Sequence, residues 1–281
     1  MAPLASVVIP AHNEQASILG TLARLSTGLE GSTLDVLVVC NGCTDRTAEV
    51  VRRTYPDVRV LEIAEASKAA AVEAGNAATD VFPRVHLDAD VTISGRSVRA
   101  LVAALAEDGV HAVAPERAVV RARSARLVRW YYDVWEQLPQ VREGLFGRGV
   151  YALDLEGQRR VEALPRMMSD DLAASEAFTA AERRIVPDAV VVVRPPQTVG
   201  DLVRRRVRVA TGNAQASALG ARSDSSVTSL ATLRKMAVEH PGMSVRMPVF
   251  IGVAGVAKLR SRHAVASGDF STWLRDESSR A

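Results

Sequence analysis

The sequence predicts an α/β fold in which a parallel sheet is flanked by helices. Short apolar runs that suit strands alternate with segments of helical periodicity over the first 95 residues, an order typical of successive β–α–β units. The run at 34–42 (LDVLVVCNG) is almost continuously apolar, which indicates a strand buried on both faces. A chain of 281 residues is long enough for one large domain or two small ones.

Four strands and three helices are expected in turn before residue 95. Pro10 ends the first strand, and Ile18, Leu22 and Leu25 then recur at helical spacing. Pro56 is expected to close the second helix. The predicted strands lie at 7–9, 34–42, 58–63 and 81–90, and the helices at 15–29, 44–56 and 65–78.

The alternation weakens after residue 95. We expect helices at 94–109, 126–142 and 198–213, and strands within 111–123, 147–157 and 188–196. Aromatic residues at 130, 131, 132 and 135 gather in one of these helices. They can form a stacking platform for an acceptor, but such a cluster is more often part of a core. The glycines of 142–154 (REGLFGRGVYALD) suit a flexible loop lining an acceptor cleft.

Charge is distributed unevenly along the chain. From Arg194 to the end, 14 Lys and Arg stand against 6 Asp and Glu, a net charge of +8, so the first 193 residues carry 21 against 26, a net charge of −5. A basic C-terminal third suits an anionic ligand, although a solvated helix face would carry the same charge. Nucleic acid is not expected as a partner, because aromatic residues that stack on bases make up only 4% of the chain.

The longest late apolar run is Met247–Ala257, which has 11 residues. A bilayer-spanning helix needs about 20, so this run is not expected to cross a membrane. We favour a buried core helix, and the alternative is peripheral contact with a membrane surface, helped by Lys258, Arg260 and Arg262 of the basic C-terminal third.

The two cysteines, Cys40 and Cys43, form a C-x-x-C pair. Thioredoxin-like redox chemistry is one interpretation of that spacing, but Asn-Gly between the cysteines indicates a turn, which we favour. The N-terminus has no basic and apolar segments of the kind found in a signal peptide. Together with the low cysteine content, this predicts a cytoplasmic protein, with contact at the inner membrane face as an addition.

Polar residues follow the predicted strands, and Asp88 and Asp90 stand directly after the fourth. Carboxyl ends of parallel strands meet at one edge of a sheet, where ligands bind. Two ionised carboxylates there need a partner, and Mg²⁺ or Mn²⁺ prefers oxygen ligands and keeps open positions for phosphate oxygens. A D-x-D triplet alone also occurs by chance and as a helix cap.

Four motifs in register resemble glycosyltransferase family 2, which has the GT-A fold: VVIPAHNE, VVCNGCTDRTAEVV, KAAAVEAGN and LDADV. The resemblance implies a Rossmann-like nucleotide-binding sheet flanked by helices, a nucleotide-sugar donor (UDP-, GDP- or dTDP-linked), Mn²⁺ or Mg²⁺, a hydroxyl-bearing acceptor and inverting transfer. The resemblance is strongest over residues 5–95 and weaker from there to about residue 215. We therefore expect a GT-A domain at 1–215, divided into a nucleotide-sugar-binding half (1–95) and an acceptor and catalytic-base half (96–215), and a C-terminal helical extension at 216–281.

The resemblance also assigns expected roles to residues in the first half. Asp45 is expected at the base, although an aspartate there also suits a helix N-cap. Lys68 opens the family's K-G-x-A-x-N pattern, in which Ala69 replaces glycine here, and a solvated helix lysine is the alternative. The residues expected to bind the nucleotide sugar are Pro10, Ala11, Glu14, Asn41, Asp45, Lys68, Asp88, Ala89 and Asp90, with Asp88 and Asp90 holding the metal.

In the second half the resemblance points to Asp170 and Asp171 as catalytic, with Asp171 the base that takes the acceptor proton. The alternative is an acidic helix N-terminus capped by Ser169. Arg205 and Arg208 are expected to contact the donor diphosphate, since arginine forks match phosphate oxygens. They share a helix face, as Arg204 and Arg208 do, whereas Arg206 points elsewhere.

Two other functions stay open on the sequence. One is a nucleotide-binding protein of the same fold without turnover. The other is a sugar nucleotidyltransferase, which would want a glycine-rich phosphate loop after the first strand, where this chain has PAHNEQAS.

Overall fold

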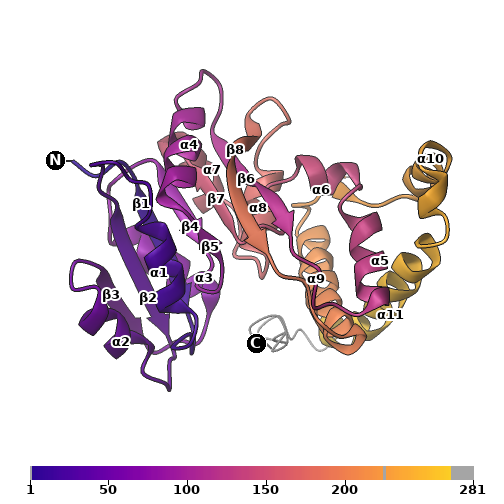
Figure 1. Ribbon diagram of the computed structural model, residues 1–281, viewed down its shortest axis with the longest axis horizontal. Helices are drawn as coiled ribbons and strands as arrows, with labels where there is room; N and C mark the ends of the chain where they lie inside the picture. Colours follow the sequence, from indigo (N-terminus) through magenta and orange to yellow (C-terminus); the bar gives the residue numbers. More distant parts are fainter. Residues whose placement is uncertain (1, 224–225, 267–281) are drawn as a thin grey trace. The chain divides into compact units, whose positions relative to one another are not determined.

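The computed structural model describes residues 2–223 and 226–266 (Figure 1). The chain forms two compact units, and both are built from separated segments. The first unit comprises the residues up to Ala118, Leu145–Arg166 and Asp170–Val193. The second comprises Val119–Gly144, Met167–Ser169 and the described residues from Arg194 onward.

The first unit is built on one sheet, whose strands run in the order β3-β2-β1-β4-β7-β6-β8-β5. β1 pairs in parallel with β2 and β4, and β2 with β3, so the predicted parallel sheet is confirmed for this half. β7 is antiparallel to β4 and β6, and β5 to β8, so the whole sheet is mixed. The bounds are β1 Ser6–Ala11, β2 Asp35–Asn41, β3 Arg59–Ile63, β4 Arg84–Leu87, β5 Thr92–Ile93, β6 Ala112–Val119, β7 Val150–Leu153 and β8 Arg183–Val193.

Helices flank this sheet, and their apolar faces fill the core. α3 packs on β1 and β2, where Ala71 lies against Leu37 and Val39. Leu37 and Val39 are fully buried on this face, and Val38 and Cys40 are buried on the other, which explains why the run at 34–42 is almost continuously apolar. The helices of this unit are α1 Ile18–Leu25, α2 Thr47–Thr54, α3 Lys68–Ala77, α4 Gly95–Leu105, α7 Leu155–Glu162 and α8 Asp170–Glu176.

The second unit is helical in the residues that the structure describes. The segment expected to be helical, 126–142, forms two helices, α5 (Arg126–Trp135) and α6 (Pro139–Glu143). Pro139 disfavours the helical conformation at the residue before it, and Leu138 is extended. The unit also contains α9 (Val199–Ala218), α10 (Leu230–Glu239), a short 3₁₀ helix η2 (Pro241–Met243) and α11 (Met247–Ala266).

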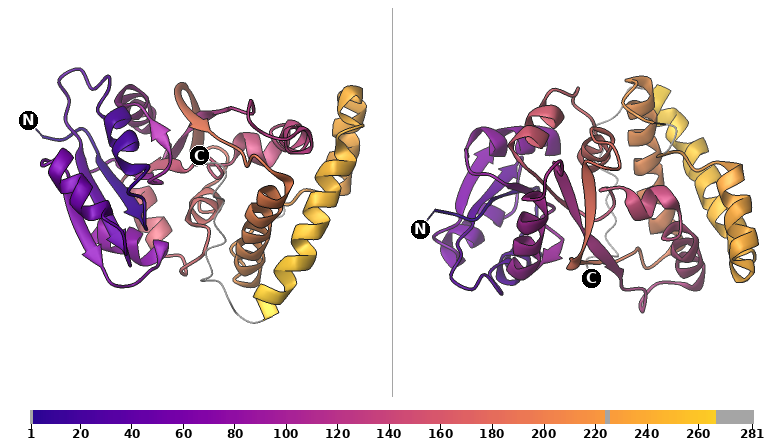
Figure 2. Two further views of the ribbon diagram at one scale, coloured as in Figure 1. Left: turned by 60° about the horizontal axis from the view of Figure 1, so that its bottom comes forward. Right: turned by 90° about the horizontal axis from the view of Figure 1, so that it is seen from above.

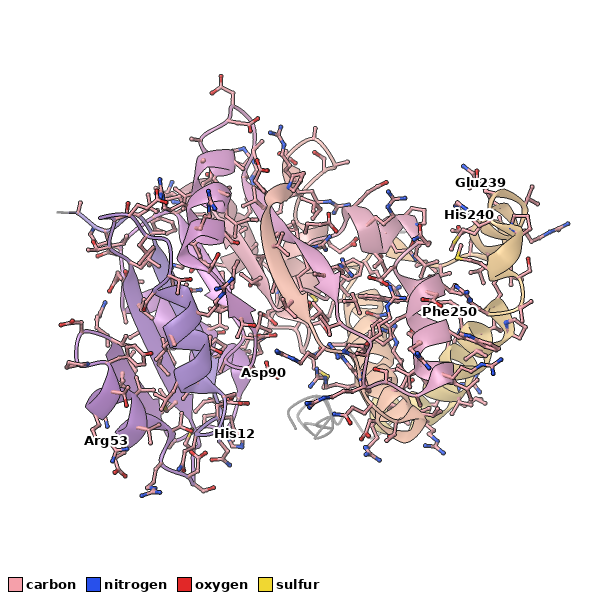
Figure 3. The ribbon with its side chains drawn as sticks, viewed as in Figure 1. His12, Arg53, Asp90, Glu239, His240 and Phe250 are labelled. Carbon is pink, nitrogen blue, oxygen red and sulfur yellow. The ribbon has the colours of Figure 1, made fainter. Side chains whose placement is uncertain are left out.

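Three of these helices share one core. α11 runs alongside α9 and also contacts α5 (Figure 2). Tyr131 of α5 stacks on Phe250 of α11 with ring centroids 5.0 Å apart, and Figure 3 labels Phe250 at this contact. Tyr131, Tyr132 and Trp135 are all buried, so the core interpretation of the aromatic cluster is confirmed for these three.

The apolar run 247–257 is buried on one face only, so the expectation of a buried core helix is half right. Met247, Phe250, Val253 and Ala257 are buried, whereas Ile251 is 48% exposed. No helix within 2–223 or 226–266 combines the length and apolarity that crossing a bilayer requires.

A tight helix–sheet contact at Gly75 gives a first prediction. A Cβ atom at Gly75 would lie 2.4 Å from Cγ1 of Val8, a fully buried side chain of β1. We expect Gly75→Ala to lower the free energy of unfolding by about 1–2 kcal/mol, because overpacking outweighs the gain in helix propensity. Gly20→Ala is the matched control: Gly20 is exposed in α1 with open space at its Cβ, and alanine there should stabilise by about 0.5–1 kcal/mol. Urea unfolding of both variants measures this, and equal effects would contradict it.

Candidate active site

The aspartate pair lies in a turn that backbone contacts hold at the end of β4. The N–H of Asp88 donates to the carbonyl of Gly149 at 2.8 Å. The hydroxyl of Thr21 in α1 donates to the carbonyl of Ala89 at 2.8 Å, and Ala89 is buried. Asp90 is exposed, and Figure 3 labels it at the edge of the sheet. The turn therefore presents two carboxylates on a fixed backbone.

Lys68 joins the aspartate pair to the acidic helix α8. It is the first residue of α3, and its Nζ lies 2.7 Å from Oδ1 of Asp88 and 2.7 Å from Oδ1 of Asp170. The lysine side chain is 20% exposed and the Asp170 side chain 21% exposed. The structure thus brings together three residues that the sequence singled out separately, and Lys68 is not a solvated helix lysine.

The charges in this cluster set three different proton affinities. Burial opposes charge on Lys68, but Asp170 and Asp88 raise the pKa of Lys68 above its usual value. Burial also opposes charge on Asp170, yet Lys68 outweighs it and lowers the pKa of that carboxyl. For Asp88, burial and the charges of Asp170 and Asp90 outweigh Lys68 and raise the pKa to about 6. Asp88 is therefore the carboxyl of this cluster that titrates near neutrality.

Asp171 contacts a glycine segment that also contacts Asp88. Oδ2 of Asp171 accepts the N–H of Gly147 at 2.8 Å, and its Oδ1 accepts the N–H of Leu172 at 2.8 Å. Gly147 and Gly149 both have a positive φ, 71° and 66°, which side chains rarely adopt. Asp170 and Asp171 lie in the first turn of α8, as the helix-terminus alternative expects, and that placement is compatible with catalysis.

Arg148, between these two glycines, was not among the predicted site residues. Its side chain is 1% exposed, and its Nε donates to the carbonyl of Pro115 at 2.6 Å. A second donation, at 3.3 Å, goes to the carbonyl of Phe146. Burial and the nearby Arg117 hold the pKa of Arg148 well below its usual value. The guanidinium fixes the glycine segment by holding backbone carbonyls, and the sequence signal was a cation between two glycines.

A buried imidazole and a buried phenol interact with the cluster, and neither was among the predicted site residues. His86 contacts Oε1 of Gln158 through Nε2 at 3.0 Å and stacks on Tyr151 with centroids 4.7 Å apart. Burial lowers the pKa of His86 to about 4, so the ring is neutral at pH 7. Burial, the nearby carboxylates and a hydrogen bond with Asp170 raise the pKa of Tyr151 well above its usual value.

The loops after β1 and β2 are tied to each other. The Nδ2 of Asn41 donates to the carbonyl of Ala11 at 3.0 Å. The Nδ1 of His12 donates in return to the carbonyl of Asn41 at 2.6 Å, and Figure 3 labels His12 in this region. Asn41 and Ala11 are buried, and Pro10 pairs with Val39 in the sheet register. These polar groups fix the ends of β1 and β2 relative to each other.

Asp45 is not the N-cap of α2, which is Arg46, but its carboxylate accepts the first N–H of that helix. Its Oδ1 accepts both the N–H of Thr47 at 3.0 Å and the Thr47 hydroxyl at 2.5 Å, at the start of α2. Its Oδ2 accepts the N–H of Gln15 at 3.1 Å, so the carboxylate also joins the two loops. Burial opposes charge, but the hydrogen bonds from Thr47 lower the pKa of Asp45. Glu14, which is buried, accepts the hydroxyl of Ser17 at 2.5 Å.

The C-x-x-C pair forms a turn. Gly42 between the cysteines has a φ of 54°, and Cys40 and Cys43 are both free. The thiol of Cys43 contacts the carbonyl of Ala11 at 3.4 Å. Burial raises the pKa of Cys40 to about 12, so this thiol is a poor nucleophile at neutral pH. The turn interpretation is confirmed.

Arg205 and Arg208 lie on α9 in the second unit. Arg205 donates to the carbonyl of Arg194 at 3.4 Å. Arg206 lies over the ring of Tyr131 at 5.7 Å, which agrees with the expectation that it points away from its neighbours. Arg204 pairs with Asp201 one turn earlier on the same helix.

The donor set at the strand ends fits a divalent cation. A Cβ atom at Gly149 would lie 3.0 Å from Oδ2 of Asp88, so the glycine leaves that oxygen uncovered while Lys68 holds the other. Within residues 2–223 and 226–266, no group of three or more His, Cys, Asp and Glu side chains is arranged to enclose a metal. A cation here would take its other ligands from water or phosphate, as Mg²⁺ commonly does.

Comparison with known proteins identifies the family. Residues 6–145 match the model of the family described as glycosyl transferase family 2. The chain belongs to glycosyl transferase family 2. This match confirms the predicted family and identifies the protein as a glycosyltransferase. No curated protein matches the chain in sequence.

Solved glycosyltransferase structures share the fold. Mannosyltransferase PcManGT from Pyrobaculum calidifontis, solved with GDP-Man and Mn²⁺, gives a TM-score of 0.61 at 21% identity and covers 95% of this chain and 80% of its own. A second similar structure is glucosyl-3-phosphoglycerate synthase from Mycobacterium tuberculosis, solved with Mn²⁺, UDP and phosphoglyceric acid. Its TM-score is 0.55 at 20% identity, and the match covers 78% of this chain and 80% of the synthase. At such identities the likeness confirms the predicted GT-A fold.

The raised pKa of Asp88 predicts a pH-dependent effect of its substitution. A carboxyl whose folded pKa is about 6 binds its proton more tightly in the folded protein than when unfolded, so it lowers stability as pH rises through about 4–6. Asp88→Asn should therefore raise the free energy of unfolding at pH 8 by about 1 kcal/mol, a value reduced for the 36% exposure of the side chain. Near pH 4 the difference should vanish.

Urea unfolding at both pH values measures this effect. Asp108→Asn, in the exposed loop after α4, is the matched control and should give the same small difference at each pH. An Asp88→Asn protein that is less stable than the wild type at pH 8 would mean that the ion pair with Lys68 outweighs burial.

Proposed function

We propose that this family 2 glycosyltransferase moves a sugar from a nucleoside-diphosphate donor to a hydroxyl acceptor with inversion at the anomeric carbon, assisted by Mn²⁺ or Mg²⁺. The main support is the cluster at the carboxyl end of β4, where Lys68 forms ion pairs with Asp88 and Asp170. The exposed Asp90 lies beside them. The complexes of the two similar enzymes, with GDP-Man and Mn²⁺ and with UDP and Mn²⁺, support the same ligand class.

Asp90 and Asp88 would hold the cation, through the exposed carboxylate of one and the uncovered Oδ2 of the other. A bound divalent ion neutralises charge that develops on the leaving diphosphate. Lys68 keeps Asp88 in place and carries a fixed positive charge at the same edge. The backbone around Ala89 is the expected contact of the donor sugar.

The nucleoside would rest on the tied loops after β1 and β2. Pro10, Ala11, Glu14, Asn41 and Asp45 are the proposed nucleotide-sugar residues of this region, and the hydrogen bonds between the loops support the proposal because they fix the surface before any ligand arrives. Pre-formed contacts reduce the ordering that binding requires. Arg205 and Arg208 of α9 are proposed to contact the diphosphate.

Asp171 is the better proposed base of the acidic pair. Lys68 holds Asp170 and lowers its pKa, so that carboxylate is a weak proton acceptor. Asp171 is instead oriented by N–H donors from Gly147 and Leu172. In the proposed step the acceptor oxygen attacks the anomeric carbon, the bond to the diphosphate oxygen breaks, and the acceptor proton passes to Asp171. One displacement inverts the configuration.

The donor site predicts a metal-dependent ligand effect on stability. We expect one of UDP, GDP or dTDP, at about 100 times its dissociation constant with Mn²⁺, to stabilise the protein by roughly 2.7 kcal/mol, or several degrees. Asp90→Ala should abolish the part that depends on Mn²⁺, because the exposed carboxylate is removed. Thermal unfolding with each nucleotide, with and without Mn²⁺, measures this.

Asp108→Ala is the matched control for the loss of an exposed carboxylate and should keep the full shift. No shift with any nucleotide, in folded protein, would contradict the donor site. A shift without turnover on any donor and acceptor would instead favour a nucleotide-binding protein of this fold, and release of pyrophosphate from a sugar phosphate and a nucleoside triphosphate would favour a nucleotidyltransferase.

The proposed base predicts a separation of binding from turnover. Asp171→Asn should reduce release of the nucleoside diphosphate from its sugar by about 10²–10⁴-fold, the usual contribution of a general base, while the nucleotide-dependent thermal shift stays unchanged. Asp188→Asn, an exposed aspartate of β8, removes the same charge elsewhere and should leave turnover intact. Full activity in Asp171→Asn would show that another group takes the proton.

A further inference from the structure

The outward side of α11 exposes apolar side chains. Its inward side packs on α9 and α5, with Phe250 stacked on Tyr131. On the other side Ile251 is 48% exposed, Val256 39% and Leu259 60%. Such exposure along one helix is unlike single apolar residues scattered over a surface, which need no explanation.

These side chains form a continuous stripe. Ile251, Gly255 and Leu259 follow one another at intervals of four residues, so they lie on the same helix face. Gly252 and Val256 run beside them at the same spacing, and all five are exposed. From Ile251 to Leu259 the stripe extends for about 12 Å along the axis. We call these five residues the α11 stripe.

Cations accompany the stripe, and α11 carries no acidic residue to neutralise them. Lys258, Arg260 and Arg262 are all exposed in its C-terminal half, and the helix sequence, MPVFIGVAGVAKLRSRHAVA, contains neither Asp nor Glu. An apolar surface with cations at its side has the two components that attach a helix to an anionic lipid surface.

We propose that the α11 stripe is a docking surface for an anionic lipid bilayer. The helix would lie in the plane of the interface, with Ile251 and Leu259 among the headgroups and upper acyl chains and the cations on headgroup phosphates. No helix of the described residues is long and apolar enough to span the bilayer, so the contact is peripheral. This proposal is independent of the transferase chemistry.

The charges favour a bilayer over a second copy of the chain. A two-fold contact through the stripe would place the cations of one helix against either the cations or the apolar half of the other. Neither arrangement offers a carboxylate from α11, so within the contact between the two helices Lys258, Arg260 and Arg262 would lose water without gaining an opposite charge. Lipid phosphates supply that charge.

Sedimentation with vesicles tests the proposal on the 281-residue chain. We expect binding to vesicles of phosphatidylcholine mixed with phosphatidylglycerol, weak binding to phosphatidylcholine alone, and weaker binding as salt is added. The double variant Ile251→Ser, Leu259→Ser should bind about tenfold less or worse. The triple variant Lys258→Gln, Arg260→Gln, Arg262→Gln should bind on the order of 100-fold less, since each cation near an anionic surface contributes roughly fivefold.

Matched controls separate the stripe from general effects of these changes. Leu155→Ser, at a similarly exposed leucine of α7, and Arg234→Gln, Lys235→Gln on α10 should leave vesicle binding unchanged. Circular dichroism checks that each variant is folded. Absence of wild-type binding to anionic vesicles would overturn the proposal, as would binding that neither the double nor the triple variant weakens. The proposal would also be overturned if the wild-type protein did not bind vesicles but formed a dimer that the double variant dissociates. That result would assign the stripe to a second copy of the chain.

Discussion

The ion pairs of Lys68 are the interaction on which the rest of the site depends. One ammonium group at the start of α3 holds a carboxylate from the turn after β4 and another from α8. Without it, two partly buried carboxylates would face each other, an arrangement that normally forces one to keep its proton. With it, Asp170 stays ionised, and Asp88 is left as the group whose charge changes near neutral pH. These three residues thus hold the turn after β4 next to α8 and give Asp88 and Asp170 different proton affinities.

A second constraint comes from the backbone between α6 and β7. The N–H of Gly147 donates to the carboxylate of Asp171, and the carbonyl of Gly149 accepts the backbone N–H of Asp88. One short segment therefore determines the separation of the two aspartates. Burial of the Arg148 guanidinium is unfavourable for its charge, but the buried side chain keeps that segment in place. Rigid support of this kind is what a site needs if its groups are to be held in a reactive geometry.

The sequence predicted those features that follow from local pattern. Continuous apolar runs identified β1 and β2 as buried strands, and the polar residues that follow strands gathered at one edge because parallel strands end there. It did not predict the ion pairs of Lys68 with Asp88 and Asp170, since a lysine in the first turn of a helix looks the same whether solvated or paired. Arg148 and His86 were missed because buried cations and imidazoles depend on tertiary surroundings. The strand β7 was predicted, but its antiparallel pairing with β4 and the helix α7 were not, because the alternation that identified the first half fades there.

The stacking of Tyr131 on Phe250 has a consequence for the order in which the chain folds. The two rings are 119 positions apart (250 − 131), and they join the first and last described helices of the second unit. At ribosomal rates of about 5–20 residues per second, α5 leaves the ribosome roughly 10 s before α11 does. During synthesis the apolar face of α5 is therefore without its final partner. The second unit can complete its core only after α11 has been made, long after α5 has left the ribosome.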